Sequence, residues 1–88
     1  MRHKKPEVMP FARNLRMLRE SKGLSLRDLA HELGIGKSSL QLYESAEADP
    51  SMTVVKMIAE YFDVDVNWLV GIKKNDIAKK FKVILGNV

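Results

Sequence analysis

The chain of 88 residues contains no cysteine, three prolines and a single tryptophan. The absence of cysteine excludes a disulfide framework and a thiolate metal site. No apolar run approaches the ~20 residues that a membrane-spanning helix needs, and no apolar stretch of signal-peptide type follows the basic start, residues 1–6. We therefore expect one cytoplasmic domain, since domains typically contain about 100–150 residues.

The sequence motifs of common enzymes are also missing. There is no phosphate-binding loop, no nucleophile elbow and no His-Glu-x-x-His pattern. His31 has no second ligand at metal-binding spacing, and the carboxylates of Glu47 and Asp49 stand in a loop without an acid–base setting. These absences predict a protein that is not an enzyme and that needs no metal, cofactor or small-molecule ligand.

The positive charge is concentrated at the two ends of the chain. The formal net charge is +4, with residues 1–6 contributing +3, residues 72–88 contributing +4 and residues 7–71 contributing −3. A basic balance favours an anionic partner such as nucleic acid. Any contact made by the middle of the chain must therefore depend on locally placed cations or on help from the ends.

Apolar residues recur with helical spacing, and no alternating strand pattern is present, so five helices are expected between residues 10 and 70. Pro10 suits a first helical turn, and Gly23 suits a helix end. Ser25 and Asp65 are expected caps of later helices, and Gly36 stands at the cap position of the helix that follows it. Residues 49–51 are expected to form a loop and the start of a helix. The predicted core positions are Phe11, Leu15, Leu18, Leu29, Ala30, Leu33, Leu40, Tyr43, Val54, Val55, Ile58 and Phe62.

Residues 25–44 form the most informative segment. Ser25, with Asp28 three residues later, reads as the capping box of one helix, and the Gly34-Ile35-Gly36 turn separates it from a second helix. Two short helices joined by a glycine-containing turn are typical of a helix-turn-helix, whose second helix lies in the major groove of DNA.

Residues 11–71 resemble the lambda-repressor/Cro-like, or XRE-like, helix-turn-helix family. The resemblance depends on motifs in order: residues 15–19, 23–25, 29–30, 33–35, 43–44, 50–51, 62–64 and 68–69. It implies an all-α, compact five-helix domain. It also implies a small prokaryotic or phage-type transcriptional regulator, with repression favoured. Such a regulator is expected to bind double-stranded DNA as a homodimer at a palindromic operator.

The resemblance also implies roles for individual residues. The base-contacting positions are Lys37, Ser38, Gln41 and Leu42, and the backbone-contacting positions are Ser25, Arg27, Ser39 and Ser45. Arg19 and Glu44 match positions that form a structural ion pair. The alternative for the polar residues is a solvated helix surface, and for Leu42 it is a patch that binds a protein partner.

Two departures from the family pattern motivate a second hypothesis. Leu26 stands where the family commonly has a glutamine that bridges a phosphate, and the loop after Glu44 carries Glu47 and Asp49 where basic residues are common. Carboxylates repel phosphate. The alternative function is therefore a protein-interaction module on the same fold, antitoxin-like or an antirepressor target, with weak or no DNA binding.

The ends complete the expected organisation: a basic arm over residues 1–9, the DNA-binding domain over residues 10–71, and a basic amphipathic helix over residues 72–88. The arm is expected either to follow the DNA or to be a solubilising tail. The last helix has an apolar stripe, which must either pack on its own domain or pair with a second chain as a dimerisation element. The stripe contains Ile77, Phe81, Ile84, Leu85 and Val88.

Overall fold

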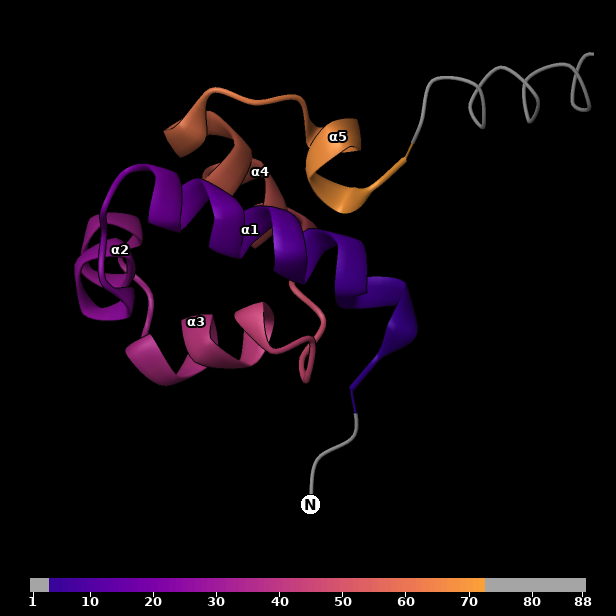
Figure 1. Ribbon diagram of the computed structural model, residues 1–88, viewed down its shortest axis with the longest axis horizontal. Helices are drawn as coiled ribbons and strands as arrows, with labels where there is room; N and C mark the ends of the chain where they lie inside the picture. The colour runs from indigo at the N-terminus through magenta and orange to yellow at the C-terminus, as the bar shows by residue number, and fades with distance from the viewer. Residues whose placement is uncertain (1–3, 73–88) are drawn as a thin grey trace, which may run out of the picture.

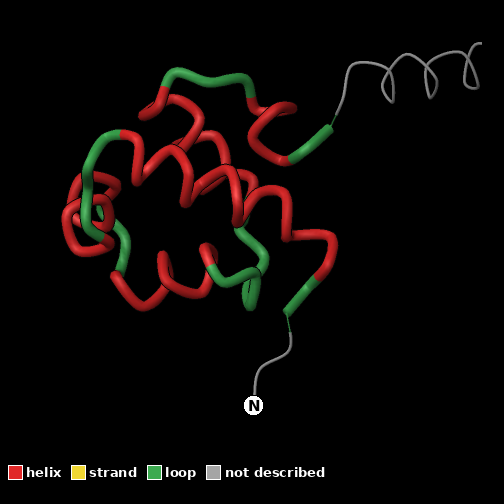
Figure 2. Tube along the Cα trace, in the orientation of Figure 1, coloured by secondary structure: helices red, strands yellow, loops and turns green. Residues whose placement is uncertain are grey.

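A computed structural model describes residues 4–72, and over this range the chain is all-helical (Figures 1 and 2). The prediction of an all-α domain with five α-helices is confirmed, with a short 3₁₀ turn in addition. The elements are η1 (Pro6–Val8), α1 (Met9–Ser21), α2 (Leu26–Leu33), α3 (Lys37–Glu44), α4 (Met52–Phe62) and α5 (Val66–Val70). No helix of the described part is long and apolar enough to cross a membrane.

The first helix organises the others. In Figure 1, α1 runs through the middle of the molecule, with α3 on one side and α5 on the other, and it contacts both. α2 packs on α3 and α4, and α4 packs on α5. The core between them is made of fully buried side chains, the largest being Leu15, Leu29, Leu40, Ile58 and Leu69.

Local sequence signals explain where most helices begin and end. The Ser25 hydroxyl accepts the Asp28 N–H at 3.0 Å, and the Ser51 hydroxyl accepts the Val54 N–H at 3.2 Å. Asp65 Oδ1 accepts two N–H groups at the start of α5. These side chains satisfy helix N–H groups that have no intrahelical partner. Gly34 ends α2 with a φ of 69°, a left-handed conformation that glycine adopts without steric cost.

The end of α5 is fitted closely against α1. The Asn14 side-chain amide donates to the carbonyl oxygens of Trp68 and Leu69, at 2.9 and 3.2 Å. Gly71 has a φ of 85°, and a Cβ at this position would lie only 2.5 Å from the Cβ of Pro10. Glycine is therefore required here both by the backbone conformation and by the close approach of α1.

Residues 5–8 belong to the folded domain rather than to a free arm. The Lys5 N–H donates to the Ala46 carbonyl at 2.7 Å, and Val8 is buried with only 5% of its surface exposed. The arm expected over residues 1–9 therefore has a second half that packs on the loop after α3. The sixth helix expected from residue 75 lies outside the described residues.

Candidate nucleic-acid interface

The outer face of α3 is polar and exposed. Four of the residues expected to contact DNA, Lys37, Ser38, Ser39 and Gln41, are exposed. Within residues 4–72, none of their side chains makes a hydrogen bond to another protein group. Their donors and acceptors are consequently available to an external partner.

Leu42 differs from these four side chains. It is half-buried, although it does not pack against the buried core cluster. Its exposed remainder can make an apolar contact, such as one with a thymine methyl group. Ser45 follows the helix and is also half-buried, and its hydroxyl donates to the Leu42 carbonyl at 3.2 Å.

The inner side of α3 is fixed by packing and by one ion pair. Leu40 is fully buried. Arg19 of α1 donates from Nε to Glu44 Oε2 at 2.7 Å and from Nη2 to Glu44 Oε1 at 3.0 Å. The Arg19 and Glu44 side chains are only 13% and 8% exposed. A bidentate pair of this kind fixes orientation as well as distance, so it sets how the end of α3 sits on α1.

Arg19 also connects the α1–α2 loop to this pair. Its Nη1 donates to the Leu24 carbonyl at 2.8 Å, so this carbonyl and the Glu44 carboxylate bind the same guanidinium. The hydrogen bonds to Glu44 raise the pKa of Arg19 above its usual range, while burial acts in the opposite direction. The guanidinium therefore stays charged and joins α1, the loop and α3.

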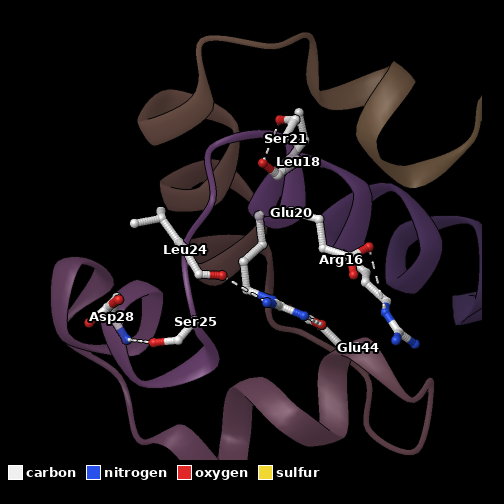
Figure 3. A network of polar contacts seen from close by, with 9 residues as sticks. Arg16, Leu18, Glu20, Ser21, Leu24, Ser25, Asp28 and Glu44 are labelled. Carbon is white, nitrogen blue, oxygen red and sulfur yellow. Dashed lines mark hydrogen bonds and ion pairs between the residues drawn. The ribbon is translucent and has the colours of Figure 1, made fainter.

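The start of α2 provides a second exposed edge. Arg27 is exposed, and Ser25 is exposed although its hydroxyl oxygen already caps the helix (Figure 3). The Ser25 hydroxyl accepts the Asp28 N–H with its oxygen, and its own O–H group can still donate to an external acceptor. The helix N-terminus adds a partial positive charge, which favours anions nearby.

Lysines from the start of the chain lie beside the acidic loop after α3 and offset part of its negative charge. Lys5 Nζ lies 4.0 Å from Asp49 Oδ2, in an exposed pair. Lys4 lines the same surface hollow as Ser45 and Ala46. Sequence reasoning missed this arrangement, because Lys5 and Ala46 are far apart in the chain. The apolar Val8, two residues after Pro6, was an available signal that residues 6–8 fold onto the domain.

The described residues give little support for a metal site. Residues 4–72 contain no group of three or more His, Cys, Asp or Glu side chains that could hold a metal ion. His31 is exposed on α2. The candidate site is therefore the exposed surface formed by α3, the start of α2 and the loop after α3.

Comparison with known proteins identifies this arrangement. The helix-turn-helix family model HTH_3 matches residues 15–69, which contain α2, the turn and α3. The chain belongs to the HTH_3 family.

Relatives with similar sequences are named as transcriptional regulators or repressors. The uncharacterized HTH-type transcriptional regulator YobD of Bacillus subtilis is 32% identical over 62 residues, which are 70% of this chain and 55% of YobD. The cryptic phage CTXphi transcriptional repressor RstR of Vibrio cholerae is 28% identical over 72 residues, 82% of this chain and 65% of RstR. This chain thus spans less than two thirds of either relative.

Solved structures of HTH_3 type have the same fold. The restriction-modification controller protein C.AhdI of Aeromonas hydrophila has a TM-score of 0.67 at 28% identity, covering 74% of this chain and 98% of C.AhdI. SinR, a master regulator for biofilm formation solved in complex with DNA, has a TM-score of 0.62 at 30% identity, covering 68% of this chain and 97% of the SinR chain. In this HTH_3 domain, α3 is the second helix of the motif.

Proposed function

We propose that this protein is a small transcriptional regulator that binds double-stranded DNA, with α3 in the major groove. The observation that carries the proposal is the outer face of α3, where Lys37, Ser38 and Gln41 are exposed while Leu40 and Glu44 hold the inner side to the domain. Second helices of helix-turn-helix domains read base edges with their first residues. The solved complex of the similar SinR domain with DNA supports the same use of this fold.

We assign base reading to the exposed side of α3. Lys37 can donate to guanine O6 or N7, Ser38 and Gln41 can donate or accept, and the exposed part of Leu42 can touch a thymine methyl group. These contacts would supply sequence selectivity. Phosphate contacts would supply most of the affinity and the register on the duplex.

The phosphate contacts come from both ends of the motif. We assign them to Ser25 and Arg27 at the start of α2, and to Ser39 and Ser45 of α3 and its cap. Lys4 and Lys5 extend this set, because residues 5–8 pack beside the loop that follows α3. The exposed Lys5–Asp49 pair offsets part of the acidic character of that loop, which had motivated a protein-interaction role.

A homodimer would present two copies of α3 to a palindromic operator, with half-sites separated by about 34 Å, one turn of DNA. Repression is the favoured direction, because the similar RstR is named a repressor. Occupying a site that overlaps a promoter is sufficient for repression.

The test is capture of genomic DNA fragments by the purified protein, followed by sequencing of the bound fragments. An enriched palindromic sequence at moderate salt is expected, with affinity that falls steeply as salt rises. If no sequence is enriched, operator binding is wrong. Affinity that is insensitive to salt would instead favour an apolar protein interface.

A double substitution then tests the assignment of α3. Lys37→Ala with Ser38→Ala is expected to lower specific affinity by roughly 10- to 100-fold, at about 1–3 kcal/mol for a base contact, and to lower nonspecific affinity much less. The matched control is Lys56→Ala with Thr53→Ala, which removes the same two groups from an exposed face of α4. Equal effects of the two double substitutions would contradict the assignment.

A further inference from the structure

A groove between α1 and α5 remains unexplained by DNA binding. It has a volume of about 700 Å³, and its apolar part is formed by Pro10, Trp68 and Ile72. Trp68 and Ile72 are 41% and 43% exposed, although both are large apolar residues. α1 and α5 lie side by side here (Figure 1), and Asn14 fixes their spacing through the Trp68 and Leu69 carbonyls. The groove is therefore built from fixed elements rather than from loose loops.

The chain reaches this groove just before its last segment begins. Gly71 N–H donates to the Trp68 carbonyl at 3.1 Å, and Ile72 N–H donates to the Asn67 carbonyl at 2.7 Å. These bonds hold Ile72 on the groove wall. Residues 73–88 follow directly, so their concentration at the groove is set by a very short tether and falls in the millimolar range or above, on the order of 1 mM.

The sequence of that last segment matches the groove in polarity. Ile77, Phe81 and Ile84 recur at helical spacing with Leu85 and Val88, and they require a cover. As a helix, residues 75–88 would extend about 21 Å, at about 1.5 Å per residue. Turns of two to five residues commonly join antiparallel helices, so Lys73 and Lys74 are enough to reverse the chain.

The charges are also complementary on the α5 side. Residues 73–88 carry five lysines and one aspartate, a net charge of +4. Residues 52–72 carry Lys56 against Glu60, Asp63 and Asp65, a net charge of −2, and Asp65 lines the groove. Arg13 is the cation on the opposite wall. A lysine beside the apolar stripe would therefore meet the Asp65 carboxylate on the α5 side of the groove.

We propose that residues 75–88 of the same chain dock in the α1–α5 groove through their apolar stripe and cover Trp68 and Ile72. The occupant is intramolecular because the tether starts on the groove wall. This role is independent of DNA binding, and it gives the basic end of the chain a fixed place on the domain, on the α1–α5 side.

Trp68 allows a direct test, because it is the only tryptophan of the chain. In the full chain, Trp68 is expected to emit at shorter wavelength than an exposed indole and to resist quenching by acrylamide. Phe81→Ser removes the centre of the stripe and is expected to raise the quenching constant about twofold, because the indole loses its apolar cover. Phe81→Leu, which keeps the stripe apolar, is expected to preserve the shielding.

Val83→Ser is the matched control, since in a helix with about 100° per residue Val83 would lie about 140° from the centre of the stripe. It is expected to leave the quenching constant unchanged. Far-UV circular dichroism checks that each variant keeps its helices. Equal quenching in Phe81→Ser and Val83→Ser would overturn the proposal.

Dilution separates docking within one chain from docking between two. Shielding of Trp68 should be the same at low and high micromolar protein, because the tether does not depend on concentration. Shielding that is lost on dilution, together with a change from dimer to monomer in sedimentation, would show that the segment comes from a second copy and would overturn intramolecular docking.

Discussion

Arg19 and Glu44 form a two-point ion pair that joins α1 to the end of α3, with distances of 2.7 and 3.0 Å between the paired atoms. The pair is largely buried, and Arg19 also binds the Leu24 carbonyl. The helix that we assign to the major groove is thus positioned by a residue that faces away from the DNA.

Removal of the Glu44 side chain should destabilise the folded domain. Glu44→Ala leaves the Arg19 charge buried without its partner and is expected to lower the free energy of unfolding by about 3–5 kcal/mol. For a domain of this size the melting temperature should fall by roughly 12–40 °C, as measured by circular dichroism. Glu20→Ala is the control, because Glu20 pairs with Arg16 at 3.8 Å on the exposed surface and such pairs contribute about 0–1 kcal/mol. Equal melting temperatures of the two variants would show that the buried pair contributes nothing.

The same pair should be insensitive to moderately alkaline pH. The pKa of Arg19 is raised in the folded protein, so its stabilisation is complete below the usual arginine pKa and is lost only as the pH rises through the higher folded value. The difference in stability between the unmodified chain and Glu44→Ala should therefore stay constant from neutral pH to about pH 10. Paired urea titrations across this range measure it, and a difference that shrinks steadily would contradict the assignment.

Gly71→Ala should disrupt the packing of the end of α5 against α1. The added methyl group would lie 2.5 Å from the Pro10 Cβ, and the backbone there has a φ of 85°. Gly23→Ala is the control, because Gly23 has a φ of 66° but open space around it. Gly23→Ala should cost about 1–2 kcal/mol for the left-handed backbone alone, and Gly71→Ala should cost clearly more. Chemical denaturation of both variants gives the comparison, and equal costs would mean that the contact with Pro10 is relieved.

Asp63→Gly is expected to stabilise the domain. Asp63 ends α4 with a φ of 54° and is exposed, so glycine should gain roughly 0.5–1 kcal/mol by removing the left-handed strain. Ala46 has a φ of 62° but is fully buried. Ala46→Gly should gain much less, because it loses a buried methyl group worth about 0.8 kcal/mol. Thermal melts of both variants test the contrast, which fails if Asp63→Gly melts lower than the unmodified chain.

Substitutions of the charged residues at the loop after α3 test whether these residues contribute to DNA affinity. Lys5→Ala should lower the slope of log affinity against log salt by about 1, as expected for one lost phosphate contact. Asp49→Asn should instead strengthen binding, since it removes a carboxylate near the phosphates. Lys56→Ala on α4 serves as the control. Fluorescence anisotropy with labelled duplex DNA measures all three, and an unchanged slope for Lys5→Ala would remove residue 5 from the interface.

Features encoded locally could be predicted from the sequence. Ser25 and Asp65 cap the helices that they were expected to cap, because a capping side chain and its N–H partner are two or three residues apart. Ser51 caps α4 at the helix start that was expected over residues 49–51. Buried positions such as Leu29 and Leu40 followed from helical spacing. The packing of Lys5 on Ala46 could not be predicted, since it joins segments with no common local signal and requires alanine to adopt a positive φ.

The candidate site was less predictable than the fold. The positions along α3 follow from the motif, and the exposure of Lys37, Ser38 and Gln41 agrees with them. The half-buried state of Leu42 did not follow from its place on the helix. The position of Lys5 beside Asp49 joins segments that are distant in the chain. Periodicity assigns a side chain to a helix face, but the packing of other segments decides how much of it remains exposed.

The residues of α3 that hold the helix to the domain are different from the residues that are exposed, and this separation has an evolutionary consequence. Leu40 and Glu44 are tied to the domain, whereas the exposed side chains of α3 make no hydrogen bond to the described protein. Substitutions at Lys37, Ser38 and Gln41 should therefore change the preferred sequence at little cost in stability. A new DNA-binding specificity can therefore arise through substitutions at a few exposed residues, without compensating substitutions in the core.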